Sequence, residues 1–217
     1  MNKKLIIQKT QAQIKKKFSG EGTGHDWWHI YRVWKLAEKI GRAEKADLFI
    51  VALGALLHDI ADFKFHGGDD TLGVKEARKW LESLKLDRLV VEKVCHIVNN
   101  VSFKGRGVKS KMKLLEGKVV QDADRLEALG AIGIARAFAV GGYMQRPLYQ
   151  PGIKPAKHKT FLQYKNRSAS TINHFYEKVL AVKNLMNTKT GKKMAVRRHQ
   201  YVEQYLKRFF AEWQGKD

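Results

Sequence analysis

A histidine and an aspartate, His58 and Asp59, directly follow a long apolar run, Leu48–Leu57. A run that is apolar at nearly every position predicts a helix buried on all sides. A buried carboxylate beside a buried imidazole is costly unless something compensates the charge, and a bound cation would do so. Adjacent nitrogen and oxygen donors at one helix end can both reach a single ion. The alternative is that both residues face water at a helix end.

A second pair of histidines, His25 and His29, precedes this run. The two are four residues apart and share one face of a predicted amphipathic helix, which Asp26 can cap. Either could bind a metal, and a site that uses both is conceivable. Arg32, three residues after His29, is a natural phosphate partner, because a guanidinium forms paired hydrogen bonds to phosphate oxygens.

Two further carboxylates, Asp122 and Asp124, follow the apolar residues Val119 and Val120. Residues two apart do not share a helical face, so at most one of the two aspartates is expected to point inward. An Asp-x-Asp sequence at the start of a helix often caps that helix instead. The residue pattern alone therefore leaves open whether either aspartate joins a metal site.

Taken together, these motifs resemble the HD-domain superfamily of metal-dependent phosphohydrolases. The resemblance rests on the order His…His-Asp…Asp, with His29-x-x-Arg32, Leu56–Ile60 and Asp122–Leu126 as they stand in this chain. It covers about residues 22–140 and is closest to small bacterial stand-alone HD proteins, some of which are nucleotide pyrophosphohydrolases. It implies an all-α helical bundle.

The resemblance also implies a ligand set of two histidines and two aspartates. In the family motif the last aspartate immediately precedes a basic residue and a leucine, which selects Asp124 over Asp122. The implied metal ligands are His29, His58, Asp59 and Asp124. Such nitrogen and oxygen donors suit a hard or borderline ion. We expect one divalent ion, Mn²⁺ in the first place, with Mg²⁺, Fe²⁺, Co²⁺, Ni²⁺ and Zn²⁺ as alternatives.

Polar residues near these motifs are candidates for catalysis and substrate binding. Asp62, three residues after Asp59, could activate water or protonate the leaving group, although an ordinary loop carboxylate is an equal alternative. Arg32 and Lys64 could hold phosphate oxygens during the reaction. The expected substrate contacts are His25, His66, His96 and Arg125. A structural role for His96 fits its position equally well.

The elements that must position these residues are predicted to be helices throughout, because strand-like alternation is nearly absent. We expect helices at 3–18, 26–41, 46–60, 70–83, 87–101 and 118–139, and a hairpin of helices 161–188 and 192–213 around Gly191. The chain is predicted to be one HD-type domain, 1–217, with a metal-binding core at about 22–140 and the C-terminal hairpin at about 160–213 packed on it.

Bulk composition limits the setting and the partners. The chain has 217 residues, and its 42 basic and 21 acidic residues give a net charge of +21. Such a charge attracts polyanions. The single cysteine, Cys95, excludes an internal disulfide and fits a reducing compartment. The apolar stretch near the N-terminus is too short for a signal peptide or a membrane span. We therefore predict a cytoplasmic protein with no membrane partner.

The leading prediction is a phosphohydrolase acting on a nucleotide or another small phosphate ester, with (d)NTP pyrophosphohydrolysis as one form. The alternative is a basic, nucleic-acid-binding helical protein whose metal site is residual or structural. Against it, aromatic residues are not interleaved with the basic stretches, as single-strand binding tends to require. An iron-dependent oxygenase is disfavoured by the small number of histidines. The sequence leaves the oligomeric state open between monomer and homodimer.

Overall fold

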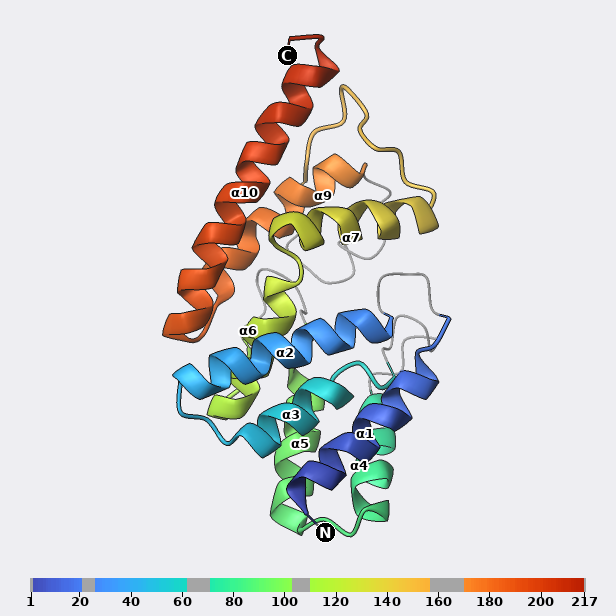
Figure 1. Ribbon diagram of the computed structural model, residues 1–217. Helices are drawn as coiled ribbons and strands as arrows, with labels where there is room; N and C mark the ends of the chain where they lie inside the picture. Colours follow the sequence, from blue (N-terminus) through green and yellow to red (C-terminus); the bar gives the residue numbers. More distant parts are fainter. Residues whose placement is uncertain (1, 21–25, 62–70, 103–109, 157–169, 217) are drawn as a thin grey trace. The chain divides into compact units, whose positions relative to one another are not determined.

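The computed structural model describes residues 2–20, 26–61, 71–102, 110–156 and 170–216. Within these ranges the secondary structure is helical and no strand occurs, which confirms the predicted all-α class (Figure 1). The chain forms two compact units. Unit 1 comprises Met1–Phe103 and Lys109–Asp124, and unit 2 comprises Lys104–Val108 and Arg125–Asp217. The organisation as a single domain stays a prediction.

Unit 1 is built around one short helix that is buried on all sides. This helix, α3 (Leu48–Leu57), contacts three others in the unit: α1 (Lys3–Lys17), α2 (Trp27–Ala43) and α5 (Arg88–Asn100). A further helix, α4 (Leu72–Ser83), packs on α5. The predicted helices at 3–18, 26–41, 46–60, 70–83 and 87–101 are thus confirmed, with ends that differ by up to three residues.

The central helix owes its position to an end cap and to a glycine. The Asp47 carboxylate accepts hydrogen bonds from the backbone N–H groups of Phe49 and Ile50, which would otherwise lack partners at the helix start. At Gly54, a Cβ atom would lie 3.1 Å from the side chain of Ile97 and 3.5 Å from Val120. The glycine therefore allows neighbouring helices to approach α3 closely.

The predicted helix at 118–139 is wrong, because the chain breaks there into two helices. These are α6 (Leu115–Leu126) and α7 (Gly130–Tyr143). Leu129 is extended and Gly130 has φ +73°, a left-handed conformation that favours glycine. Asp122 and Asp124 consequently lie in the last turns of α6, not at a helix start. The possibility that they cap a helix N-terminus is excluded by this position.

The described residues of unit 2 form α7, α9 (Thr171–Glu177), a 3-10 helix η2 (Val179–Leu185) and the 25-residue α10 (Lys189–Trp213). α10 contacts α7 and η2, and α9 contacts η2 and α7. The buried apolar side chains between them include Phe175 from α9 and Val202 and Leu206 from α10. The apolar face of α10 thus forms one side of this core.

The C-terminal hairpin differs from the prediction in detail. α10 begins at Lys189, and the Thr188 hydroxyl caps it by accepting a hydrogen bond from the N–H of Gly191. Gly191 is therefore buried in the first helical turn and does not form the turn of a hairpin. The preceding chain is also not one helix, because α9 ends at Glu177 and continues as η2. Residues 161–169 lie outside the described ranges.

In the described part of the chain, no single helix has both the length and the apolar character needed to cross a membrane. The pair α6 and α7, bent by 69°, passes that test together by length and composition only.

Removing the cap of α3 should destabilise unit 1. We expect Asp47→Ala to lower the free energy of unfolding by about 1 kcal/mol, because two backbone N–H groups lose their acceptor. Asp47→Asn is the matched control and should lose little, since asparagine caps as well as aspartate. Urea denaturation followed by circular dichroism measures both. Equal stability of the alanine and asparagine variants would contradict the role of the cap.

Candidate metal centre

The helix α2 positions His29 with its ring inside unit 1. The Asp26 carboxylate caps this helix by accepting a hydrogen bond from the backbone N–H of His29, 2.9 Å away, as the sequence predicted. The His29 side chain has no solvent-exposed surface. It lies on the buried side of the helix with Ile30, Val33 and Ala37. The cap and the apolar face together fix where the imidazole lies.

The end of α3 supplies the next two polar side chains. His58 is the C-terminal cap residue of α3, and Asp59 follows it. The Nδ1 atom of His58 lies 2.8 Å from the carbonyl oxygen of Ala55. Because a carbonyl can only accept, Nδ1 carries a proton, which leaves Nε2 as the atom that can bind a metal.

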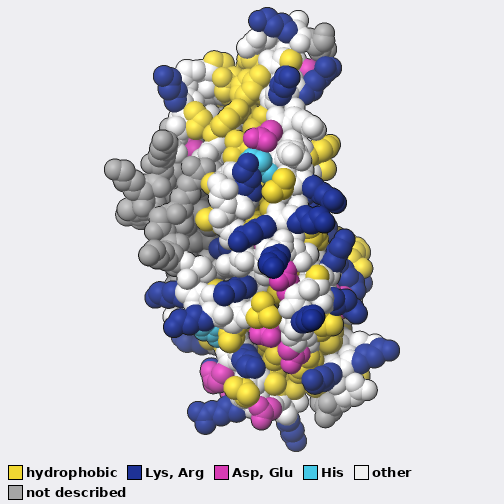
Figure 2. All heavy atoms as spheres, turned by 90° about the vertical axis from the view of Figure 1, so that its left-hand side faces the viewer, with side chains coloured by type: hydrophobic (Ala, Val, Ile, Leu, Met, Phe, Trp, Pro, Cys, Tyr) yellow, Lys and Arg dark blue, Asp and Glu magenta, His cyan; other side chains and the backbone are white. Residues whose placement is uncertain are grey.

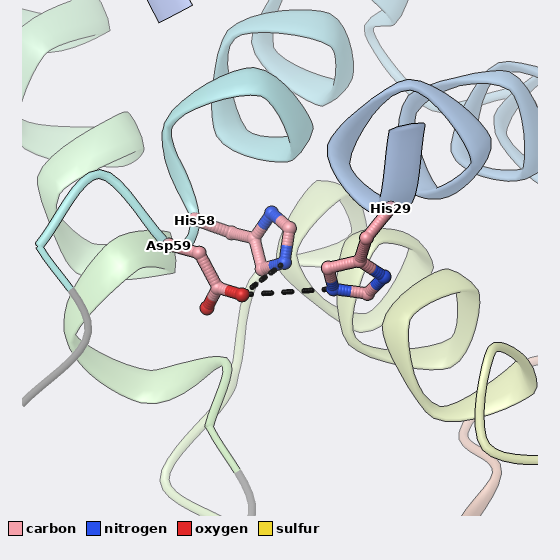
Figure 3. Close-up of side chains that lie close together, drawn as sticks. All are labelled: His29, His58 and Asp59. Carbon is pink, nitrogen blue, oxygen red and sulfur yellow. Dashed lines mark ion pairs between the residues drawn. The ribbon is translucent and has the colours of Figure 1, made fainter. Parts of the chain in front are cut away.

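These side chains converge on one point, as Figure 3 shows for His29, His58 and Asp59. The Oδ2 atom of Asp59 lies 3.3 Å from Nε2 of His58 and 3.6 Å from Nε2 of His29. The ligand atoms of the three residues all lie within 4.8 Å of one another. The two imidazole rings meet edge to face, with centroids 5.4 Å apart.

The helix α6 brings a second carboxylate to the same place. The Oδ1 atom of Asp124 lies 3.6 Å from Nε2 of His29 and 3.9 Å from Nε2 of His58. The side chain of Asp124 is 28% exposed, whereas those of the two histidines are at most 1% exposed. Asp124 is thus the most exposed of the four side chains.

The donor set and its spacing fit a divalent metal ion. Ligand atoms at about 2.1 Å from an octahedral ion lie roughly 3 Å apart when adjacent and roughly 4 Å apart when opposite. The distances from Oδ2 of Asp59 to the two imidazole nitrogens, 3.3 and 3.6 Å, and those from Oδ1 of Asp124, 3.6 and 3.9 Å, fall in this range. Within the described residues, the group whose ligand atoms all lie within 4.8 Å of one another is His29, His58 and Asp59, and it does not include Asp124. Moreover, Nε2 of His58 is buried and faces Oδ2 of Asp59 at 3.3 Å. A buried nitrogen in that position is suited to a metal.

The electrostatics of the cluster favour positive charge. Burial lowers the pKa of His58, but the negative charges of Asp59 and Asp124, helped by hydrogen bonding to Asp59 and Ala55, outweigh burial and raise that pKa to about 9. The same two carboxylates that hold a proton on His58 would attract a cation. A metal ion and this proton therefore compete for Nε2.

The other predicted site residues are only partly described. Arg32 lies in α2, one turn after His29, and is half-buried. His96 lies in α5, where the side-chain nitrogen of Asn100 is 3.5 Å from its Nδ1 atom. Four predicted residues lie outside the described ranges: His25, Asp62, Lys64 and His66.

Asp122 and Arg125 lie close to Asp124 in α6 but differ from it in environment. The Arg125 guanidinium donates a hydrogen bond to the backbone carbonyl of Leu185, and both residues belong to unit 2. This contact gives the arginine a structural partner, while its expected contact with substrate stays a prediction. Asp122 is fully buried, whereas Asp124 is partly exposed. The two aspartates are two residues apart and therefore leave the helix in different directions.

An all-α fold with a buried cluster of imidazoles and carboxylates is suited to a metal-binding protein. The family model of the HD domain matches residues 27–129, which include the whole cluster. The chain is also 40% identical over 200 residues to the uncharacterized protein YpgQ of Bacillus subtilis, across 91% of this chain and 88% of YpgQ. The chain belongs to the HD-domain superfamily of metal-dependent phosphohydrolases.

Solved structures agree with this assignment. A protein of Lactobacillus plantarum matches with a TM-score of 0.87 and 32% identity, over 99% of this chain and 100% of that one. An HD-superfamily hydrolase of Bacillus thuringiensis matches with a TM-score of 0.76 and 40% identity, over 98% and 99%. YpgQ in complex with ADP matches with a TM-score of 0.73 and 37% identity, over 95% and 100%.

One contributor to the cluster could not be found from side-chain motifs. The carbonyl of Ala55 orients His58 and determines which ring nitrogen is available. Every residue has a backbone carbonyl, so no residue type signals this role. The only hint in the sequence is that Ala55 lies one helical turn before His58.

Metal binding should release a proton from His58 near neutral pH. Below about pH 9 the metal-free ring is protonated, whereas a metal needs the neutral nitrogen. Calorimetric titration with Mn²⁺ in buffers of different ionisation enthalpy measures the protons released. We expect close to one proton per ion near neutrality, fewer above pH 9, and an apparent affinity that rises with pH up to that value. No proton release near neutrality would contradict the deduced protonation of His58.

Proposed function

We propose that this protein hydrolyses phosphate bonds of a nucleotide at the cluster in unit 1. The observation that carries the proposal is that the ligand atoms of His29, His58 and Asp59 lie within 4.8 Å of one another, with Oδ1 of Asp124 3.6 and 3.9 Å from the two imidazole nitrogens. Nucleotides are favoured over other phosphate esters because YpgQ, 40% identical, has been solved in complex with ADP.

In this proposal His29, His58, Asp59 and Asp124 hold one divalent ion, with Mn²⁺ as the first candidate. When bound, such an ion makes a coordinated water more acidic and polarises a phosphate oxygen. The protein supplies the orientation: the Asp26 cap fixes the helix that carries His29, and the Ala55 carbonyl fixes the ring of His58. Two negative carboxylates balance the two positive charges of the ion.

Positive and donor groups near the cluster would bind the substrate phosphates. Arg32 lies one helical turn after His29, so its guanidinium starts from the same segment of α2. Its planar group can bind two phosphate oxygens at once. Arg125 follows Asp124 directly and is a second candidate. Its guanidinium also donates a hydrogen bond to the carbonyl of Leu185. Lys64, His66 and His25 are proposed for the same purpose on the sequence pattern alone.

His96 is proposed as a further hydrogen-bond donor to substrate. Its Nε2 atom is buried and has no hydrogen-bond partner within the described chain. The amide nitrogen of Asn100 donates to the backbone carbonyl of His96, 2.9 Å away, which orients the amide with its N–H groups towards the imidazole. Nδ1 is then the acceptor and Nε2 carries the proton. A buried N–H without an acceptor is costly, and a phosphate oxygen would supply one.

A base is also required to move protons during hydrolysis. Asp62 is our candidate, since it follows Asp59 by three residues and a carboxylate can accept a proton from water or donate one to the leaving group. This assignment rests on the sequence, because Asp62 lies outside the described residues. If Asp62 acts in this way, Asp62→Asn would lower kcat while metal affinity stays unchanged.

Removing the charge of Asp124 should abolish most activity. The purified protein is assayed against a panel of nucleotides and simple phosphate esters with Mn²⁺, Mg²⁺, Co²⁺, Ni²⁺, Fe²⁺ and Zn²⁺. Asp124→Asn keeps the size of the side chain but weakens metal binding, so kcat/KM should fall on the order of 100-fold or more. Asp87→Asn is the matched control, because asparagine preserves the cap of α5. No metal-dependent hydrolysis of any nucleotide would refute the proposed function.

The products distinguish two forms of the reaction. If the enzyme is a (d)NTP pyrophosphohydrolase, single-turnover reactions should yield nucleoside monophosphate and pyrophosphate in equal amounts. Ion-exchange chromatography of the quenched reaction separates pyrophosphate from orthophosphate. Orthophosphate as the sole inorganic product would refute pyrophosphohydrolysis but leave phosphate-ester hydrolysis at the same site intact.

A further inference from the structure

An unusually apolar segment is exposed in unit 2 after α7. Within residues 143–153, Tyr143 is 65% exposed, Met144 52%, Leu148 59% and Ile153 38%. Single exposed apolar residues are common, but a contiguous group on the surface of a monomer marks an interaction site. We call residues 143–155 the apolar loop.

The apolar loop is held in place by backbone contacts to α9. The N–H of Thr171 donates to the carbonyl of Pro147, 2.9 Å away, and the N–H of Ile172 donates to that of Leu148, 3.0 Å away. The side-chain amide of Asn173 donates to the carbonyl of Ile153, 2.9 Å away. Because the backbone is anchored at these points, the exposed side chains are presented in a defined arrangement.

Aromatic side chains of α10 extend this apolar surface. The ring of Tyr149 packs edge to face against Phe209, Phe210 and Trp213, with centroids 5.1–6.2 Å apart. Trp213 remains 49% exposed. Tyr149 therefore joins the middle of the apolar loop to the C-terminal end of α10, and Figure 1 shows that part of the loop beside the end of α10 within unit 2, whereas the loop begins at the far end of α7.

The rim of this surface is basic. Residues 143–156 contain no Asp or Glu, whereas Arg146 and Lys154 lie within the loop. The end of α10 adds Lys207, which is exposed. At the end of α10, Glu212 pairs with Arg208. Figure 2, which views the molecule from the left-hand side of Figure 1, shows Lys and Arg side chains spread over that face.

We propose that the apolar loop and the end of α10 form a docking surface for an anionic lipid bilayer. Aliphatic and aromatic side chains surrounded by cations are the pattern of interfacial membrane binding: the apolar groups enter the headgroup region and the cations meet anionic lipids. This surface would attach the protein from one side and does not require a spanning helix. It departs from the sequence-based prediction that no membrane is a partner.

Two other partners fit this surface less well. A second copy of the chain would bring two basic rims together, and like charges at an interface oppose association.

Single-stranded nucleic acid binds through exposed ring faces on which bases stack. Here Tyr149 is enclosed by three rings, Trp213 stacks on Phe209 at 21°, and the most exposed apolar side chains besides Tyr143 are Leu148 and Met144. Aliphatic side chains add nothing to base stacking but insert readily into lipid.

Vesicle co-sedimentation of the full chain tests this proposal. We expect binding to vesicles of phosphatidylglycerol and phosphatidylcholine, little binding to pure phosphatidylcholine, and weakening by added salt. Leu148→Glu should weaken binding to the anionic vesicles about tenfold or more, because it removes an inserted apolar group and adds a repelled charge. Leu89→Glu is the matched control: Leu89 is 63% exposed in α5 of unit 1, and its replacement should leave binding unchanged.

Three outcomes would overturn the proposal. The first is equal sedimentation with neutral and anionic vesicles, or with neither. The second is a dimer in light scattering that Leu148→Glu dissociates, which would assign the surface to a second copy. The third is binding of a fluorescent oligonucleotide that Leu148→Glu abolishes. Nucleotide hydrolysis by both variants, measured in the absence of lipid, should match the unsubstituted protein, so failure of membrane docking is separate from failure of the proposed function.

Discussion

Burial of charge governs the structure around the metal centre. The imidazoles of His29 and His58 have almost no exposed surface, and Asp59 is only 11% exposed, yet the carboxylates lie within 4 Å of both rings. Negative charge that is shielded from solvent is unfavourable unless a cation balances it. Without a metal, a proton on His58 takes part of that role, which is why its pKa rises to about 9 despite burial.

Parts of unit 1 that supply no candidate metal ligand hold the cluster in place. The apolar helix α3 is buried at nine of its ten positions, so its C-terminal end, with His58 and Asp59, is fixed relative to the helices around it. Gly54 allows Ile97 and Val120 to pack against that helix. Val120 belongs to α6, which also carries Asp124. The approach of Val120 to Gly54 therefore helps to place α6, and with it Asp124, beside the end of α3.

The sequence predicted the helix positions and the helix caps that follow directly from residue type. The apolar run predicted a buried helix, and the aspartate before α2 predicted a cap. The choice of Asp124 as a metal ligand, which rests on the family motif, stays a prediction. Prediction from the sequence failed where the backbone conformation of a single glycine determines where a helix begins or ends. The break between α6 and α7 depends on the positive φ of Gly130 within a sequence that reads as one helix. Gly191 resembled a turn residue, but the Thr188 cap places it inside α10. The orientation of His58 by a carbonyl has no sequence signal.

The central claim is that one divalent ion is bound by His29, His58, Asp59 and Asp124. The most direct test is an anomalous difference map from crystals grown with Mn²⁺ and recorded at the manganese absorption edge. We expect a single strong peak in unit 1, in contact with Nε2 of both histidines, Oδ2 of Asp59 and Oδ1 of Asp124. A peak elsewhere, or protein atoms filling the space between these four side chains with no peak there, would contradict the claim.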